Sequence, residues 1–215
     1  MSEVIFLDKN CAEVKYLCAK DKRIAKVVDM VGPITYTVHS DSYAFLVHEI
    51  IEQMLSIKAG AAIYGRLQSL CGGLITPDAI DILTDDEIKS IGTSRPKVNC
   101  IRSLTDSVIS GAIDFNLLPD MSDADVIKTL TAVKGIGNWS AKMYLIFALN
   151  RPDVLPTEDV AFLQSYKWLY KTEDCKPASV TAKCKKWKPY SSIAARYMYR
   201  ALDLGLTKNE FHLYK

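Results

Sequence analysis

Apolar side chains recur at helical spacing along most of this chain. Between Asp21 and Pro33, four apolar positions share one helical face: Ile24, Val27, Val28 and Val31. Asp21 can cap the start of this helix, and Gly32 followed by Pro33 would end it. Residues 1–20 have no strong period, so a short irregular or extended segment is predicted there.

The segment from Asp41 to Cys71 predicts a long helix, a tight corner and a second helix. Small residues gather at positions 59–62, which lets neighbouring helices approach closely. His48 lies on the first helix with no partner in view in the sequence, and we interpret it as structural.

Further helices are expected downstream, so the pattern as a whole predicts an all-α fold. Pro77 begins one helix, and the pair Thr84 and Glu87 has the spacing of a capping box. The remaining helices are predicted at 98–110, 123–130 with Ser122 as its cap, from about Asn138, and 160–170.

The composition limits the class of protein but does not identify a function. With 215 residues, of which 49% are hydrophobic, the chain can bury a sizeable core as one domain. The formal net charge of +2 is a weak argument for nucleic acid, so any basic surface must be local. There is no run of 18 apolar residues and no cleavable leader, so a soluble, unexported protein without a membrane partner is expected.

Six cysteines are scattered along the chain without any CxxC pair: Cys11, Cys18, Cys71, Cys100, Cys175 and Cys184. This spacing favours reduced thiols of a cytosolic protein over a metal site.

A Gly-Ile-Gly turn joins the predicted helices at 123–130 and from Asn138. Gly135 and Gly137 have no Cβ, so both can adopt left-handed backbone angles and allow close approach, while Ile136 packs inward. Unpaired N–H groups and the positive end of the second helix can hold a phosphate without reading base sequence. An ordinary αα-hairpin explains the two glycines equally well.

The flanking residues decide between these interpretations. KGIGNWSA from Lys134, then Phe147, NRPDVLP from Asn150, and finally Asp159 resemble a known signature. It is the helix-hairpin-helix plus Gly/Pro…Asp signature of the base-excision DNA glycosylase superfamily, and the nearest match is 3-methyladenine DNA glycosylase II. The resemblance implies an all-α, two-lobed helical fold.

The N-terminal sheet domain of longer relatives is not expected, because only about twenty residues precede the first matching helix. The whole chain, 1–215, would form a single glycosylase domain. One helical lobe would span about 44–150 and contain the hairpin 125–150, and the second would combine 1–43 with 151–215. Asp159 would stand in the cleft between the lobes.

By this resemblance Asp159 is the catalytic carboxylate. The alternative from the residues alone is that Asp159 is only the N-cap of the helix 160–170. Trp139 occupies the position where bifunctional relatives carry a Schiff-base lysine. Since tryptophan cannot form an imine, base release without cleavage of the strand is expected.

The corner EQMLS, residues 52–56, is similar to the family's minor-groove corner. The resemblance implies that Met54 fills the gap left by an extruded base and that Gln53 bonds base edges nearby. The alternatives are that Met54 packs in the core and that Gln53 bonds only its own corner. Arg95 and Lys97 are either phosphate contacts or solvated charges.

The C-terminal segment is similar to the family's closing helix, WxPxRSxA, with Ser191 in place of the expected arginine. Tyr199 corresponds to a base-pocket tryptophan, although Tyr197 competes for that place because only one of the two can line a cleft. Met143 stands where some relatives have a pocket tyrosine. Lysines at 171–188 form either a solvated face or a contact to the DNA backbone.

The hairpin residues implied to bind the DNA backbone are Lys134, Gly135, Gly137 and Ser140. Hairpins of this kind can also bind a structural Na⁺ or K⁺ through backbone carbonyls, here those of Thr131, Val133 and Ile136. No other cofactor is expected, and the iron–sulfur cysteines of some relatives are missing from the sequence.

The sequence therefore predicts a monomeric, monofunctional DNA glycosylase that flips alkylated purines out of damaged double-stranded DNA and excises them by hydrolysis. Such an enzyme would work in the cytoplasm on the bacterial nucleoid, or in a nucleus. Two alternatives remain: a glycosylase for uracil, mismatched or oxidised bases, and a DNA-binding protein without catalysis.

Overall fold

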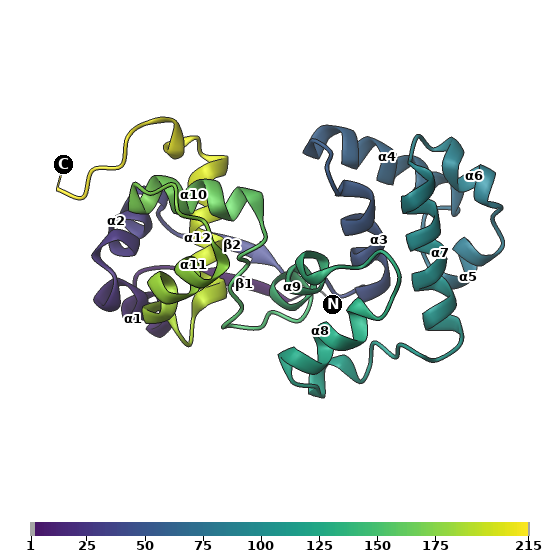
Figure 1. Cartoon of the computed structure of the whole chain (residues 1–215), viewed down its shortest axis with the longest axis horizontal. Coiled ribbons are helices and arrows are strands. Elements are labelled where there is room, and N and C mark those ends of the chain that lie inside the picture. The colour runs from purple at the N-terminus through teal and green to yellow at the C-terminus, as the bar shows by residue number, and fades with distance from the viewer. Residues whose placement is uncertain (1–2, 215) are drawn as a thin grey trace. The chain divides into compact units, whose positions relative to one another are not determined.

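The computed structural model describes residues 3–214 and is mainly helical (Figure 1). The chain forms two compact units. Residues 39–149 make up one unit, and the segments before and after them together make up the other. The predicted lobe boundaries, after residues 43 and 150, lie within five residues of these divisions. The all-α prediction is confirmed, with the addition of one small sheet.

The unit of residues 39–149 contains only helices among its described elements. They are α3 (Ser42–Glu52), α4 (Ile57–Leu70), α5 (Pro77–Asp81), α6 (Asp85–Ser90), α7 (Arg95–Ile109), η1 (Leu118–Asp120), α8 (Asp123–Thr131) and α9 (Asn138–Phe147). Their starts follow the sequence closely. Thr84 and Glu87 form the predicted capping box, and Ser122 caps α8.

The second unit joins the two ends of the chain. Its elements are β1 (Val4–Leu7), α1 (Ala12–Lys20), α2 (Lys22–Val31), β2 (Ile34–Thr37), α10 (Val160–Tyr170), α11 (Pro177–Cys184), η2 (Lys185–Trp187), α12 (Ser191–Asp203) and η3 (Leu206–Lys208). Helix α12 packs against α1, α2 and α10, so it forms the centre of this unit. Its buried face is continuous with the core that Leu17, Phe162 and Trp187 help to fill.

Two features of the first forty residues differ from the prediction. Residues 12–20 form the helix α1 instead of an irregular segment, because Val14 and Leu17 are buried against α2 and α12. Residues 4–7 are extended as expected, but they pair antiparallel with β2 in register from Val4 opposite Thr37 to Leu7 opposite Ile34. Strands of four residues carry too little alternation to be recognised from sequence.

Asp21 is a buried charge that connects three elements of this unit. Its side chain caps α2 by accepting the N–H of Arg23 at 3.0 Å. The same carboxylate accepts hydrogen bonds from Tyr170 at 2.5 Å and from the Trp187 indole at 3.0 Å, and Lys186 lies 3.0 Å away. Burial acts to raise the pKa of Asp21, but these hydrogen bonds together lower it below the ordinary value.

No helix in the described part of the chain has both the length and the apolar character needed to cross a membrane.

We expect Asp21→Asn to lower the free energy of unfolding by about 2 kcal/mol, because an amide N–H₂ would face groups that already donate. Urea unfolding followed by circular dichroism measures the change. Asp29→Asn is the matched control, since Asp29 pairs with Lys9 on the surface and should contribute less than about 0.5 kcal/mol. Equal losses in the two variants would contradict the structural role of Asp21.

The same contact predicts a pH dependence. The folded pKa of Asp21 lies below the ordinary value of 3.8, so its contribution is present above that pH and is lost as pH falls through the lower, folded value. The difference in stability between wild type and Asp21→Asn should therefore shrink in acid. A difference that stays constant from pH 7 to pH 3 would count against this account.

Candidate functional site

The hairpin formed by α8 and α9 depends on one glycine for its close packing. Gly135 has φ of 100°, and a Cβ added there would lie 2.6 Å from the Cys100 Sγ on α7. Neither the backbone angle nor the space permits a side chain at this position. Ile136 is buried, as predicted, and fixes the turn to the core of its unit.

Gly137 differs from the expectation of a left-handed residue. Its φ of −104° is open to any residue, and a Cβ there would meet no atom within 4 Å. It is the N-cap of α9 and, as a glycine, has no side chain with which to cap the first turn. No side chain of the N-cap residue accepts from the N–H groups of that turn.

Lys134 is exposed beside the turn, but Ser140 is buried. The Ser140 hydroxyl accepts a hydrogen bond from the Gln53 side chain at 3.2 Å, which ties the α3–α4 corner to the hairpin. Ser140 would therefore contact a phosphate through its backbone N–H rather than through its hydroxyl. The Gln53 side chain thus bonds a residue of α9 instead of its own corner, and its contact with base edges stays a prediction.

The corner between α3 and α4 presents Met54 to solvent. Its side chain is 101% exposed, so the interpretation as a core residue is wrong. Its φ of 58° lies in the left-handed region that costs a non-glycine residue about 1–2 kcal/mol. A large apolar side chain is held in water on a strained backbone, an arrangement that folding alone does not favour.

Lys97 holds this corner in place. Its ammonium group donates to the carbonyls of Ile51 at 2.8 Å and Gln53 at 2.7 Å, at the C-terminal end of α3. Burial lowers the pKa of Lys97. Arg95 instead forms surface ion pairs with Asp85 and Asp86. Neither side chain is merely a solvated charge, and no signal in the sequence identified these partners.

A loop of residues 150–158 leads to Asp159, and the start of α12 holds this loop. The N–H of Ser192 donates to the Pro152 carbonyl at 3.0 Å, and the Ser192 hydroxyl accepts the N–H of Val154 at 2.9 Å. Ser191, which replaces the expected arginine, donates its hydroxyl to Asp153 at 2.5 Å. Asp153 therefore connects the loop to the start of α12.

Asp159 lies at the N-terminus of α10 and is 8% exposed. Its Oδ1 accepts the N–H of Phe162 at 2.6 Å, which makes it the N-cap of the helix. The structure thus bears out the N-cap interpretation, and a capping contact does not exclude a catalytic role for the same carboxylate.

The predicted aromatic and apolar pocket residues occupy different environments. Trp139 and Tyr199 are both half-buried, on α9 and α12, whereas Met143 is buried on α9. Tyr197 is fully buried and donates its hydroxyl to the Leu7 carbonyl at 3.3 Å. Tyr197 is therefore a core residue, which leaves Tyr199 as the candidate on α12.

The backbone of the hairpin offers the carbonyls predicted for a monovalent cation. Ile136 donates its N–H to the Val133 carbonyl at 3.1 Å, so one lone pair of that oxygen is engaged inside the turn. A carbonyl oxygen has a second lone pair, so the donor set remains compatible with Na⁺ or K⁺.

Comparison with known proteins gives a consistent result. A family model described as HhH-GPD superfamily base excision DNA repair protein matches residues 47–189. The chain is 29% identical over 188 residues to DNA-3-methyladenine glycosylase 1 of Schizosaccharomyces pombe, which covers 86% of this chain and 82% of that protein.

Two solved structures are similar over nearly the whole length. The DNA-3-methyladenine glycosidase of Bacillus halodurans has a TM-score of 0.85 and 34% identity over 97% of both chains. The 3-methyladenine DNA glycosylase of Schizosaccharomyces pombe in complex with abasic DNA has a TM-score of 0.82 and 26% identity, covering 95% of this chain and 100% of that chain.

The two hairpin glycines should respond differently to substitution. Gly135→Ala should lower the free energy of unfolding by about 2–4 kcal/mol, because it adds both backbone strain and a contact with Cys100. Gly137→Ala, the matched control, should cost less than about 1 kcal/mol. Urea denaturation measures both, and Cys100→Ala should rescue part of the first loss. Equal costs for both glycines would contradict the geometry described.

Proposed function

Because the chain belongs to the HhH-GPD superfamily of base excision DNA repair proteins, we propose that it excises alkylated purines from double-stranded DNA as a DNA glycosylase. Its substrates would be bases of the 3-methyladenine and 7-methylguanine type. The observation that carries this proposal is the Asp159 carboxylate, buried at the N-terminus of α10, at the position that the resemblance assigns to the catalytic carboxylate. The names of the similar glycosylases support the choice of substrate.

DNA is the partner in this proposal, and the hairpin supplies the contact. The N-terminus of α9, with the exposed residues Lys134, Gly137 and Asn138 around it, would receive a backbone phosphate. The related glycosylase solved with abasic DNA supports this assignment. Any monovalent cation held by the carbonyls of Thr131, Val133 and Ile136 would add positive charge at the same turn.

The chemistry follows from the bond that breaks. Alkylation at N3 or N7 gives the purine a positive charge, so the base leaves readily and the sugar acquires oxocarbenium character. A carboxylate about 4 Å from that cation, at an effective dielectric constant near 20, stabilises it by about 4 kcal/mol, or about a thousandfold in rate. Asp159 would supply this charge and orient the attacking water.

Strand cleavage by β-elimination is not part of the proposal. That reaction needs an amine that forms an imine with the sugar, and Trp139 stands at the corresponding position. The protein would therefore release the base and leave an intact abasic strand.

Trp139 and Tyr199 each offer an aromatic face to a base. Stacking on an aromatic side chain contributes about 1–3 kcal/mol per base. A cation–π contribution would favour a positively charged alkylated purine over a normal base. Met143, buried in the same helix as Trp139, replaces an aromatic residue of some relatives and would influence the range of bases accepted.

Met54 would serve as the wedge that enters the DNA stack. Extruding a base costs a few kcal/mol, and an apolar side chain that refills the gap offsets part of this cost. The full exposure and left-handed backbone of Met54 support this role. We propose that a single copy of the chain acts on the DNA, in whichever compartment holds it.

Asp159→Asn should reduce excision about a thousandfold while the protein stays folded, because asparagine can still accept the Phe162 N–H but carries no charge. The assay incubates dimethyl-sulfate-treated duplex DNA with enzyme and identifies released bases by chromatography. Glu158→Gln, which changes the adjacent exposed carboxylate, is the matched control and should keep near wild-type activity.

Duplexes with uracil, a mismatch or 8-oxoguanine separate the alternatives. Release of one of these bases without release of 3-methyladenine would assign another specificity. If the wild type and Asp159→Asn release equally little of every base while both bind DNA, the protein is a binding module and the enzyme proposal fails.

Met54→Gly should separate stability from activity. Glycine accepts φ of 58° without strain, and the lost side chain buries nothing, so the free energy of unfolding should stay level or rise by up to about 1 kcal/mol. Excision from duplex DNA should fall at least tenfold, with a smaller loss on single strands, where no stack needs refilling. A loss of stability of 2 kcal/mol, or unchanged duplex activity, would oppose the wedge role.

A further inference from the structure

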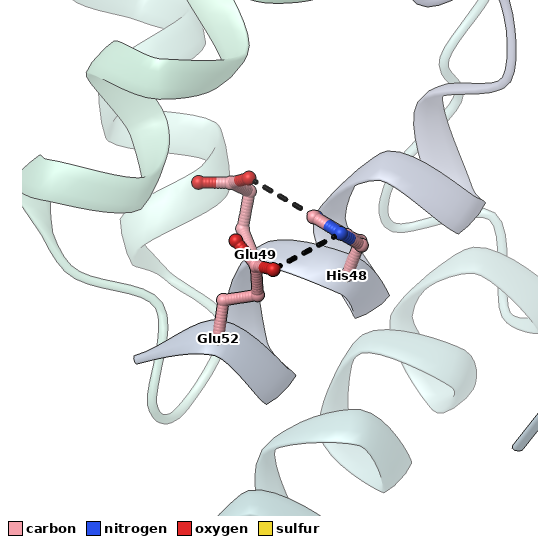
Figure 2. A group of neighbouring side chains, drawn as sticks. All are labelled: His48, Glu49 and Glu52. Atoms are coloured by element: carbon pink, nitrogen blue, oxygen red, sulfur yellow. Dashed lines mark hydrogen bonds and ion pairs between the residues drawn. The ribbon is translucent and has the colours of Figure 1, made fainter. Parts of the chain in front are cut away.

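Three side chains of types that can bind a metal ion lie together on α3, apart from the catalytic and DNA-contacting residues proposed above. His48, Glu49 and Glu52 all belong to the last turns of α3, and Figure 2 shows the two carboxylates directed toward the imidazole. Their ligand atoms lie within 4.8 Å of one another, and no other group of this kind occurs in the described part of the chain. The sequence indicated a lone structural histidine here, so both partners were missed.

The two ring nitrogens have separate partners. Nδ1 lies 3.4 Å from Glu49 Oε1, and Nε2 lies 3.4 Å from Glu52 Oε1 (Figure 2). We propose that this cluster is a zinc-type divalent-cation site, in which His48 Nε2 and Glu52 bind the ion and Glu49 orients the imidazole. Water would complete the coordination, since the three side chains are 13–35% exposed.

The separation of Nε2 and Glu52 suits a shared ion. Zinc binds nitrogen at about 2.0–2.1 Å and carboxylate oxygen at about 2.0–2.2 Å, so a tetrahedral angle places the two donors about 3.4 Å apart. The distance between His48 Nε2 and Glu52 Oε1 has this value. Residues four apart on a helix also share a face, which lets them chelate one ion.

Glu49 supplies the support that a metal-binding histidine usually has. Such a histidine donates its other ring N–H to an oxygen, which fixes the tautomer and makes the binding nitrogen more basic. In the tautomer in which Glu49 accepts from Nδ1–H, the lone pair of His48 would be on Nε2, the nitrogen that faces Glu52.

The fold makes room for this arrangement between α3 and α4. A Cβ at Gly60 would lie 2.7 Å from Cγ of Glu52, so the glycine provides the space that the carboxylate side chain occupies. Tyr64, also on α4, packs edge-on against the His48 ring with centroids 4.8 Å apart. The site lies near the C-terminal end of α3, where the helix dipole favours a cation.

The neighbouring groups shift the pKa values of His48 and Glu52. The hydrogen bond to Glu49 raises the pKa of His48 despite the opposing effect of burial, and the charge of Glu52 adds to this rise. Burial raises the pKa of Glu52, an effect that the His48 charge partly offsets. Glu49 and Glu52 on α3 and the Tyr64 ring on α4 thus all lie against His48.

The location gives the site a structural consequence. Glu52 is the last residue of α3 and directly precedes Gln53 and Met54. An ion that joins His48 to Glu52 would therefore brace the final helical turn before the strained corner.

Isothermal titration calorimetry of the full chain with ZnCl₂ at pH 7.5 tests the proposal. His48→Gln and Glu52→Gln should each weaken binding at least tenfold, and Glu49→Gln by about tenfold through the lost support. His212→Gln is the matched control, because His212 also faces a glutamate, Glu210, at 3.8 Å and should leave the affinity unchanged. Mg²⁺ should give no heat from this site, since it prefers oxygen donors.

A second measurement guards against variants that fail to fold. Imidazole NMR signals of His48 in the wild type should shift on addition of Zn²⁺ and show the Nδ1–H tautomer. Gly60→Ala keeps all three side chains but displaces Glu52, so it should remain helical by circular dichroism and bind Zn²⁺ at least tenfold more weakly. Unchanged His48 signals, or equal zinc affinity in the wild type and His48→Gln, would overturn the proposal and leave an ordinary ion pair.

Discussion

A buried carboxylate stays ionised only where hydrogen-bond donors and helix dipoles stabilise its charge. Both buried aspartates among the described residues, Asp21 and Asp159, meet this condition at helix N-termini. Asp21 uses it to bind distant elements of its unit together. Asp159 accepts the Phe162 N–H at the start of α10, and the proposed chemistry depends on a negative charge at this position.

The position of Asp159 is set by the loop before it, which α12 holds through two serines. Ser192 bonds the loop backbone on both sides of Asp153, and Ser191 bonds the side chain of Asp153. Ser191 departs from the arginine of the family pattern. Ser191 fastens the loop by a short hydrogen bond from its hydroxyl to the Asp153 carboxylate.

Features determined by short stretches of sequence could be predicted, whereas features that depend on contacts between residues far apart in the chain could not. The hairpin, the capping box at Thr84 and the bounds of α10 follow from short patterns of caps and apolar residues. The bonds of Lys97 to α3 join positions 44 and 46 residues apart, and α1 is stabilised by packing against helices that include α12. Glu49 and Glu52 are close to His48 in sequence, but their convergence on both ring nitrogens depends on side-chain geometry.

The exposure of Met54 has a chemical consequence as well as a mechanical one. Oxidants reach a thioether in open solvent directly, and they convert it to a sulfoxide, which is polar. Because the side chain packs against nothing in the free protein, this change would leave the fold intact while making the tip of the corner hydrophilic. A protein that repairs chemical damage thus exposes one of its own atoms to a related kind of damage.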